Sequence, residues 1–374
     1  MTERAIQMPT DVLLLGTGAF AARIAFDVAA TAKEPVRIMI AGRNALRLDW
    51  LRTAANARAA IFNTAARFVT EQFDLLEQSA LANLVGQTRP SVVVQAASVQ
   101  TSAVIATTND AWSRLVAEGG LSATAVFQTV VSAAVARAVR DVHPAAHMVN
   151  CCFPDVVNGM LVAMGLPVTC GTGNVSILAN AFAGATSEES VAARDVKVLA
   201  HYQTIGAWRR PAAERDGPVP RVWISDAEIA DVFTQFRPVL LTPEPAIEIS
   251  GAAGVPMILA MATGHIWSGH APGPHGLPGG YPVCWHEGVL SLDLPSGLSR
   301  NEAIAWNRQF EATSGLVVDG TRVTYTGRLA ERLRGFGLAC ADGFDVADID
   351  QVYREMQGLR NRLQMGTYPI GVSN

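Results

Sequence analysis

Two glycines and an alanine near the start of the chain have a spacing that suits phosphate binding. Gly16, Gly18 and Ala21 form the pattern G-x-G-x-x-A between an apolar run and an alanine-rich stretch. In such a turn the first glycine permits a tight bend and the second lets a pyrophosphate approach the backbone. The small third residue lets the helix pack closely on its strand, and the unpaired N–H groups of the helix face the phosphates. The residues predicted to hold a dinucleotide are Gly16, Thr17, Gly18, Ala19 and Phe20. A plain strand-turn-helix without a ligand is the alternative.

The residues after the next strand-like run indicate which dinucleotide. An NAD site is expected to carry an Asp or Glu about 20 residues beyond the glycines, where it binds the ribose hydroxyls. This sequence has Arg43 there, followed by Asn44. A guanidinium can bind a 2′-phosphate with two hydrogen bonds. Arg43 and Asn44 therefore predict NADP(H), unless Arg43 is only a solvated residue at the start of the next helix.

A third group of candidate cofactor residues follows the fourth strand-like run, 91–97. Ligands of parallel sheets bind beyond the carboxyl ends of the strands. The small residues Ala96, Ala97 and Ser98 occupy that position. We expect them to lie near the ribose and the nicotinamide.

The order of the elements predicts the fold class. Strand-like and helix-like runs alternate through the first 100 residues, which is typical of an α/β, Rossmann-type doubly wound parallel sheet. At 374 residues the chain is long enough for a second domain, and beyond residue 184 the alternation stops. The predicted parts are a cofactor domain at 1–155, an α+β substrate and dimerisation domain at 156–345, and a C-terminal helix at 346–374 that could return to the first domain.

Three local predictions within the second part bear on the site. The run Val175 to Leu178 is interpreted as a strand after a glycine-rich turn, and Asp226 to Phe236 as a helix capped by Asp226. The stretch Ala262 to Pro282 holds three histidines and has no periodicity. It is interpreted as a long loop that either covers the substrate or forms an interface, or else serves as a rigid structural connection.

The first 100 residues also carry a family resemblance. The strings Gly16 to Ala21, Ala41 to Asn44 and Val92 to Ala97 together resemble the NADP-binding domain of the saccharopine dehydrogenase group of reductases. The resemblance implies a dehydrogenase or reductase that acts on a small polar metabolite of the keto, imino or amino acid type. Beyond these residues no family is identified.

A nicotinamide-dependent reductase also needs a proton donor and a means of holding its substrate. His201 and Tyr202, at the end of a strand-like run, are the first candidates for the donor, and the loop histidines His265, His270 and His275 are the next. Arg209 and Arg210 could bind a substrate carboxylate, and His265 and His275 are further candidates for substrate binding. Each of these side chains could instead be structural or simply solvated.

Two other functions remain open at this stage. Cys152 precedes Pro154, and Cys-Phe-Pro is similar to the string around the nucleophile of acylglutamyl-phosphate reductases. A thiol there, with its pKa lowered by the helix N-terminus, would serve a semialdehyde or acyl-phosphate reductase. Alternatively, the chain binds NADP(H) without turnover, as a sensor or scaffold.

Composition limits the partners. The chain is 49% hydrophobic and 17% charged, with a formal net charge of −4, so it lacks the basic balance of proteins that bind nucleic acid or anionic membranes. Its five cysteines form no C-x-x-C pair and no secretory signal is evident, which predicts free thiols, no metal site and a cytoplasmic protein. We expect a small-molecule substrate and a homodimer.

Overall fold

A six-stranded parallel sheet organises the first half of the computed structural model, which describes residues 10–100, 109–186, 195–242 and 246–366. The strand order is β3-β2-β1-β4-β5-β6, with a crossover between β1 and β4. This is the doubly wound order, so the predicted fold class is confirmed. The strands are β1 (Val12–Leu15), β2 (Val36–Gly42), β3 (Ala66–Gln72), β4 (Val92–Gln95), β5 (His147–Asn150) and β6 (Cys170–Gly171).

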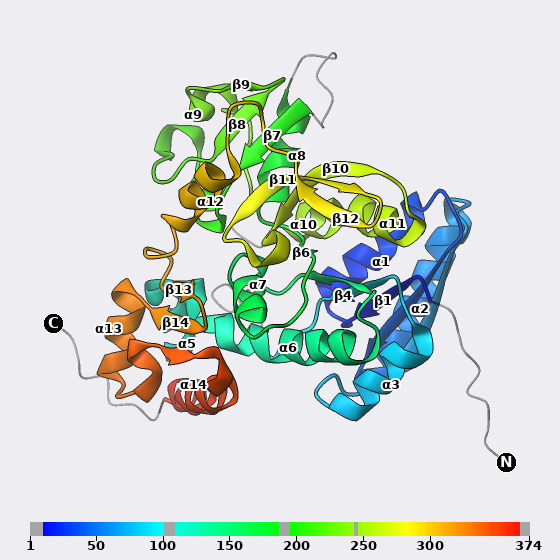
Figure 1. The fold of residues 1–374 in the computed structure, drawn as a ribbon, viewed down its shortest axis with the longest axis horizontal. Helices are drawn as coiled ribbons and strands as arrows, with labels where there is room; N and C mark the ends of the chain where they lie inside the picture. The colour runs from blue at the N-terminus through cyan, green and yellow to red at the C-terminus, as the bar shows by residue number, and fades with distance from the viewer. Residues whose placement is uncertain (1–9, 101–108, 187–194, 243–245, 367–374) are drawn as a thin grey trace.

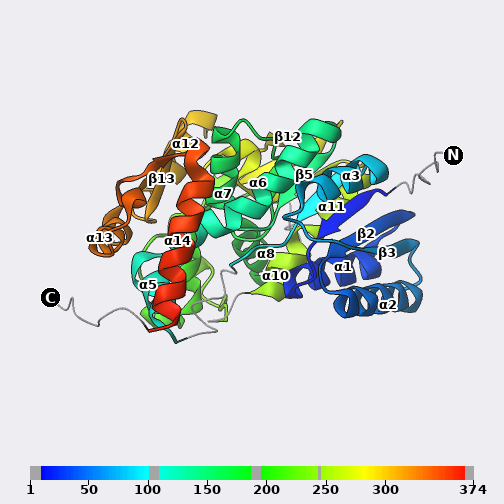
Figure 2. The same ribbon diagram turned by 90° about the horizontal axis from the view of Figure 1, so that it is seen from below.

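Helices cover both faces of this sheet because its strands are apolar on both sides. Val12 and Leu14 belong to the core on one face, whereas Leu13 and Leu15 belong to the core on the other. Figure 2 shows α1 and α2 on one side of β2 and β3, with α3 on the opposite side. The helices around the sheet are α1 (Ala19–Thr31), α2 (Ala45–Ile61), α3 (Gln78–Thr88), α5 (Ala111–Gly119), α6 (Ala125–Val142) and α7 (Pro154–Ala163).

The long apolar helix of the first half is a core element. Within the described residues, Leu121–Val142 is the one helical stretch long and apolar enough to cross a membrane. However, 89% of its apolar window is buried inside the fold. Its Phe127 and Val135 have no exposed surface, and Phe127 packs edge-on against Tyr353 of the C-terminal helix.

Small antiparallel sheets and helices form the second half (Figure 1). The sheets are β7-β8-β9, β10-β11-β12 and β13-β14-β15. The strands are β7 (Val196–Leu199), β8 (Arg221–Ile224), β9 (Ala227–Glu228), β10 (Trp267–Pro272), β11 (Gly280–His286), β12 (Val289–Leu292), β13 (Leu316–Asp319), β14 (Arg322–Tyr325) and β15 (Phe344–Asp345). The helices are α8 (Val175–Ala185), α9 (Val232–Gln235), α10 (Ile247–Ala253), α11 (Val255–Thr263), α12 (Arg300–Arg308), α13 (Gly327–Gly335) and α14 (Ile349–Gln364).

Two parts of the second half pack directly on the first. α10 lies against α1 at Gly251, where a Cβ would come within 2.5 Å of Cγ of Arg23. The C-terminal helix α14 shares a core with α5 and α6, and its Arg360 donates a hydrogen bond to the carbonyl of Val99, beyond β4. The last helix thus contacts the sheet domain, although the predicted domain boundaries stay a prediction.

Three local predictions are wrong. Val175 begins helix α8 and not a strand. The prediction failed because a short apolar run that is buried on all sides has the same sequence pattern in a helix and in a strand. Most of Asp226 to Phe236 is not helical: Ser225 and Asp226 have positive φ values of 48° and 66° in the turn between β8 and β9. Only Val232–Gln235 is helical, and Asp231 caps it.

The long loop predicted at Ala262 to Pro282 is also an error. After the end of α11, the segment forms the β10–β11 hairpin, in which Trp267 pairs with Trp285 and Pro272 with Gly280. The glycines of this segment interrupt any sequence periodicity. Three of them have positive φ at the hairpin turn: Gly273, Gly276 and Gly279. These residues bend the chain and do not signal a loop.

Gly273 brings the hairpin turn against the first turns of α7. Its φ is 58°, and a Cβ there would lie 2.5 Å from the carbonyl oxygen of Pro154 and 2.7 Å from Nδ2 of Asn158. The Asn158 amide in addition donates a 2.9 Å hydrogen bond to the Gly273 carbonyl. The contact leaves no space for a methyl group.

Gly273→Ala is therefore expected to lower the free energy of unfolding by roughly 2 kcal/mol or more, because it combines positive φ with overpacking. Urea unfolding followed by circular dichroism measures this loss. Gly206→Ala is the matched control, since a Cβ at Gly206 meets nothing within 4 Å. Equal stability of the two variants would contradict the contact described here.

Candidate functional site

The glycine-rich turn after β1 is shaped for a phosphate. Gly16 has a φ of 128°, and a Cβ there would lie 3.1 Å from the backbone of Ala96. Gly18 is exposed and is the N-cap of α1; no side chain caps the helix, and a Cβ at Gly18 would meet nothing within 4 Å. The first N–H groups of α1 thus face open space, so the residues present fit a dinucleotide pyrophosphate.

The end of β2 places arginines beside this turn. Arg43 is exposed, and no hydrogen bond or ion pair joins its guanidinium to the described residues. Asn44 caps α2 by accepting the N–H of Arg47 at 3.0 Å, so its side chain is already engaged. Nε of Arg47 donates to the carbonyl of Thr17 at 3.3 Å. Sequence reasoning missed Arg47, whose only signal was its position one turn into the helix after Arg43.

A buried polar network fixes the loops beyond β4 and β5. The side-chain amide of Gln95 donates to the carbonyl of Ala97 at 2.6 Å. The side-chain oxygen of Gln95 accepts the N–H of Ala97 at 3.3 Å. The Asn150 amide donates to Oδ1 of Asn158 at 2.8 Å, and its oxygen accepts the N–H of Cys152 at 3.0 Å. Ala96, Ala97 and Ser98 therefore follow β4 in a defined loop at the carboxyl edge of the sheet, beside Gly16.

His201 and Tyr202 lie together but are enclosed. His201 is 1% exposed and stacks on Phe310 with a ring separation of 5.4 Å. Burial lowers the pKa of His201 to about 3, so its imidazole is neutral at pH 7. The hydroxyl of Tyr202 donates to the Ser314 carbonyl at 3.3 Å, and burial raises its pKa to about 12. Both side chains are held by the fold, and their proposed role as proton donors stays a prediction.

The three hairpin histidines do not converge on one point. Nε2 of His270 accepts the N–H of Val198 at 2.9 Å, and burial lowers the pKa of His270 to about 3. Nε2 of His275 bonds the carbonyl of Leu290 at 2.9 Å. His265 pairs with Glu34 at 2.7 Å, and Glu34 precedes β2, at the opposite edge of the sheet from the glycine-rich turn.

The predicted substrate arginines lie on the unit formed by β7, β8 and β9. Arg209 is the last residue of the 3-10 helix Tyr202–Arg209, and Arg210 is its C-cap. Nη1 of Arg209 donates to the Thr242 carbonyl at 2.6 Å, and Arg210 forms an ion pair with the exposed Asp216. The structure thus gives each arginine a local partner.

Cys152 is buried, and its environment differs from the one predicted. The thiol lies 3.3 Å from the carbonyl of Ala97, and burial raises its pKa instead of lowering it. Phe153 has a φ of 46° and turns the chain into α7. The neutral thiol is the weaker nucleophile, so this geometry does not favour the cysteine mechanism.

Sequence reasoning did not identify Asp155 and Asn174 as a pair. Asp155 is in the first turn of α7, where the sequence predicted a helix start, yet it is only 3% exposed. The amide of Asn174 donates to its Oδ2. Burial raises the pKa of Asp155 to about 6, although hydrogen bonds from Asn174 and from nearby backbone oppose the shift. A first-turn Asp usually indicates only a helix start, so the sequence carried no signal of its burial.

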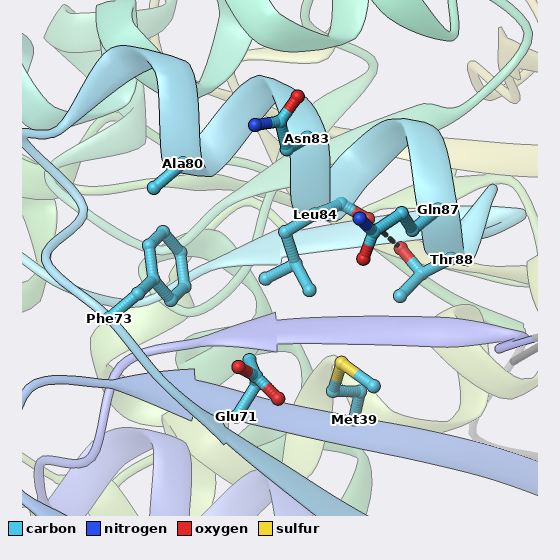
Figure 3. Close-up of a pocket in the computed structure, with 8 residues that line it drawn as sticks. All are labelled: Met39, Glu71, Phe73, Ala80, Asn83, Leu84, Gln87 and Thr88. Atoms are coloured by element: carbon cyan, nitrogen blue, oxygen red, sulfur yellow. Dashed lines mark hydrogen bonds between the residues drawn. The ribbon is translucent and has the colours of Figure 1, made fainter. Parts of the chain in front are cut away.

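Two cavities lie near the sheet. One, of about 290 Å³, lies between α3 and strands β2 and β3, and Glu71 is the only ionisable side chain lining it (Figure 3). It extends from Phe73, whose N–H donates to the carbonyl of Gly42 at the end of β2, to Thr88, whose carbonyl accepts the N–H of Thr10 before β1. The other, of about 430 Å³, runs along α7 from Asp155 to Ala163. Within the described residues, no three His, Cys, Asp or Glu side chains are grouped as metal ligands would be.

Two malate dehydrogenases are among the solved structures that are similar to this chain. Malate dehydrogenase from Salinibacter ruber is 14% identical to this chain, and the match has a TM-score of 0.53. The match covers 88% of this chain and 100% of the malate dehydrogenase chain. Malate dehydrogenase from Picrophilus torridus is 12% identical, covers 82% of this chain and 98% of its own, and has a TM-score of 0.52. The chain has a Rossmann-type fold. No family profile matches the sequence, and no curated protein matches it.

Acid should destabilise the protein through His201. Its pKa is about 3 in the folded state, against about 6.5 when unfolded, so only the unfolded chain takes up a proton between these values. The contribution of His201 to the free energy of unfolding is complete above pH 6.5 and falls by about 1.4 kcal/mol for each pH unit below that value. Urea unfolding from pH 7.5 to pH 4.5 should give a shallower pH slope for His201→Phe than for the wild type. Parallel slopes would mean that His201 can be protonated in the folded protein.

Proposed function

We propose that the protein is an NADP(H)-dependent oxidoreductase that transfers a hydride to or from a small hydroxy or keto acid. The observation that carries the proposal is the open N-terminus of α1 at Gly18, beside the exposed guanidinium of Arg43. The turn suits the pyrophosphate, and Arg43 suits the 2′-phosphate that distinguishes NADP from NAD. Malate dehydrogenases of the same fold support the class of substrate.

The chain's own residues would bind and orient the coenzyme. Gly16 and Gly18 let the pyrophosphate reach the backbone, and Arg43 with Arg47 provides positive charge at the ribose end. The loop at Ala96 to Ser98 follows β4, where the ribose and nicotinamide lie in folds of this order. The bound nicotinamide supplies the hydride chemistry, and the protein supplies position and electrostatics.

The finer features of the proposal rest on sequence reasoning. These are the resemblance to the saccharopine dehydrogenase group, cytoplasmic location and a homodimer that takes up a small-molecule substrate. Gel filtration with light scattering tests the dimer.

The rival is an NADP(H)-binding sensor or scaffold without turnover. This function is favoured by the burial of the side chains of His201, His270 and Cys152. Burial moves the pKa of each side chain away from 7, so none of them exchanges a proton readily at neutral pH. NADPH absorbance with oxaloacetate, pyruvate and related keto acids separates the two functions. Oxidation of NADPH by any of them supports the oxidoreductase, whereas tight NADPH binding without oxidation supports the sensor.

Arg43→Ala is expected to weaken NADPH binding by about 1 to 3 kcal/mol, because it removes a charge-assisted pair with the 2′-phosphate. NADH binding should change little. Calorimetric titration of both coenzymes measures the difference, and Arg328→Ala, an exposed arginine on α13, is the control. Equal losses for the two coenzymes would show that Arg43 does not bind the 2′-phosphate.

Gly18→Val tests the pyrophosphate site separately. The valine side chain would extend into the open space at the N-terminus of α1 without touching protein atoms at its Cβ. Binding of both coenzymes should weaken at least about tenfold, because the side chain blocks approach to the backbone. Fluorescence titration measures binding, and the melting temperature should stay near that of the wild type. Unchanged affinity would place the dinucleotide elsewhere.

A further inference from the structure

Arg360, on the C-terminal helix α14, is held in place by neutral groups. Nη1 of its guanidinium donates to the carbonyl of Val99 at 3.3 Å and to Oε1 of Gln100 at 3.2 Å. Its Cζ lies 4.6 Å from the centre of the Phe127 ring, so the cation lies over the aromatic face. These contacts fix the direction in which the guanidinium points.

The positive charge of Arg360 has no acidic partner among the described residues. None of the residues three and four positions away on α14 is acidic; they are Met356, Gln357, Leu363 and Gln364. Arg360 is half-buried, and a partly desolvated cation is less stable without an anion beside it. The fold therefore leaves a positive charge that an anionic ligand can neutralise.

One nitrogen of the guanidinium remains for such a ligand. Nε of Arg360 is enclosed by protein and makes no hydrogen bond to the described residues. Nη2 makes none with them either but, unlike Nε, it keeps accessible surface. A charged N–H donor prefers the anionic oxygen of a carboxylate or phosphate. A ligand can therefore meet Nη2 while Nη1 stays bonded to the loop after β4.

Phe127 places this guanidinium beyond the carboxyl edge of the sheet. Ser132 of α6 donates to Oδ1 of Asn150, at the end of β5, at 3.2 Å. α6 leads into β5, so it runs from the carboxyl edge of the parallel sheet toward the amino edge. Phe127 precedes Ser132 by five residues, or about 7.5 Å of helix rise, and so lies outside the carboxyl edge. Ligands of doubly wound sheets bind at that edge.

The loop after β4 connects Arg360 with the glycine-rich turn. A Cβ at Gly16 would lie 3.1 Å from the backbone of Ala96. Val99 follows Ala96 by three residues, which span at most about 11 Å of chain. The guanidinium bonded to Val99 thus lies within roughly 15 Å of the turn. The nicotinamide end of a coenzyme bound at the turn, with a substrate beside it, would occupy this interval.

We propose that Nη2 of Arg360 binds the carboxylate of the hydroxy or keto acid. The inference rests on the proposed function and adds to it the residue that selects acids as substrates. Arg209 and Arg210, the candidates from the sequence, have local partners on the unit formed by β7, β8 and β9. A neutral ketone lacks the anionic oxygens that Arg360 would bind, so it is the weaker substrate.

The experiment titrates the full-length protein with oxamate and with oxamide by calorimetry, both with saturating NADPH and without coenzyme. Oxamate is a stable analogue of a keto acid, and oxamide has nearly the same shape but a neutral amide in place of the carboxylate. We expect saturable binding of oxamate, with oxamide bound at least about tenfold more weakly. No saturable binding of oxamate, or equal binding of the two compounds, would overturn the proposal.

Variants of Arg360 locate the binding. Arg360→Gln keeps a donor for the loop but removes the charge, and it should weaken oxamate at least about tenfold while oxamide changes little. Arg360→Lys keeps the charge and should weaken oxamate less, and it replaces the first variant if that one does not fold. Arg354→Gln is the matched control, since Arg354 is exposed on the same helix and bonds the carbonyl of Asp350. Unchanged oxamate affinity in the Arg360 variants would refute the assignment.

The carboxylate site and the proposed function can fail separately. In an active enzyme, Arg360→Gln should raise the KM for pyruvate at least about tenfold, with a smaller change in kcat, in the KM for methyl pyruvate and in NADPH affinity. NADPH oxidation with an unchanged KM for pyruvate would leave the function standing and overturn the role of Arg360. Oxamate binding that depends on Arg360 in a protein that oxidises no NADPH would support the carboxylate site and refute the oxidoreductase.

Discussion

The buried side chain of Asn150 holds the carboxyl edge of the sheet together. Its oxygen accepts hydrogen bonds from Ser132 of α6 and from the N–H of Cys152, and its amide reaches Asn158 of α7. Asn158 in its turn donates to Gly273 of the hairpin. A fully buried amide is tolerated only when its donors and acceptors are paired. This requirement fixes the start of α7 and the hairpin turn relative to β5.

Two helix N-termini at this edge are used in opposite ways. α1 begins with small residues and no side-chain cap, so its positive end is available to a phosphate. α7 begins with Pro154 and the buried Asp155, so a negative group of this chain already occupies its positive end. Helix dipole and backbone hydrogen bonds favour the charged form of Asp155, yet burial outweighs them and raises its pKa. The same local geometry thus leaves the N-terminus of α1 without a side-chain cap and places a carboxyl group at the N-terminus of α7.

The parts predicted well are those that depend on neighbours in sequence. The turn at Gly16 and Gly18 follows from backbone geometry, and the alternation of strands and helices follows from apolar runs and breaks, so the parallel sheet was predictable. The β10–β11 hairpin was not predictable from the sequence. Its strands contain many glycines and prolines, and they are defined by pairing between residues that are apart in the chain, such as Trp267 and Trp285. The histidines were misjudged for a related reason: His270 accepts a hydrogen bond from Val198, about 70 residues earlier.

The sequence alone determined the glycine-rich turn, the arginine after β2 and the parallel sheet, because each needs only local backbone preferences and an apolar pattern. Tertiary structure alone decided which polar groups are exposed, paired or left without a partner. Burial and distant contacts set the protonation of His201 and Asp155 and brought Asp155 and Glu311 to one cavity. These properties depend on solvent exclusion by segments far apart in the chain, which no local pattern encodes.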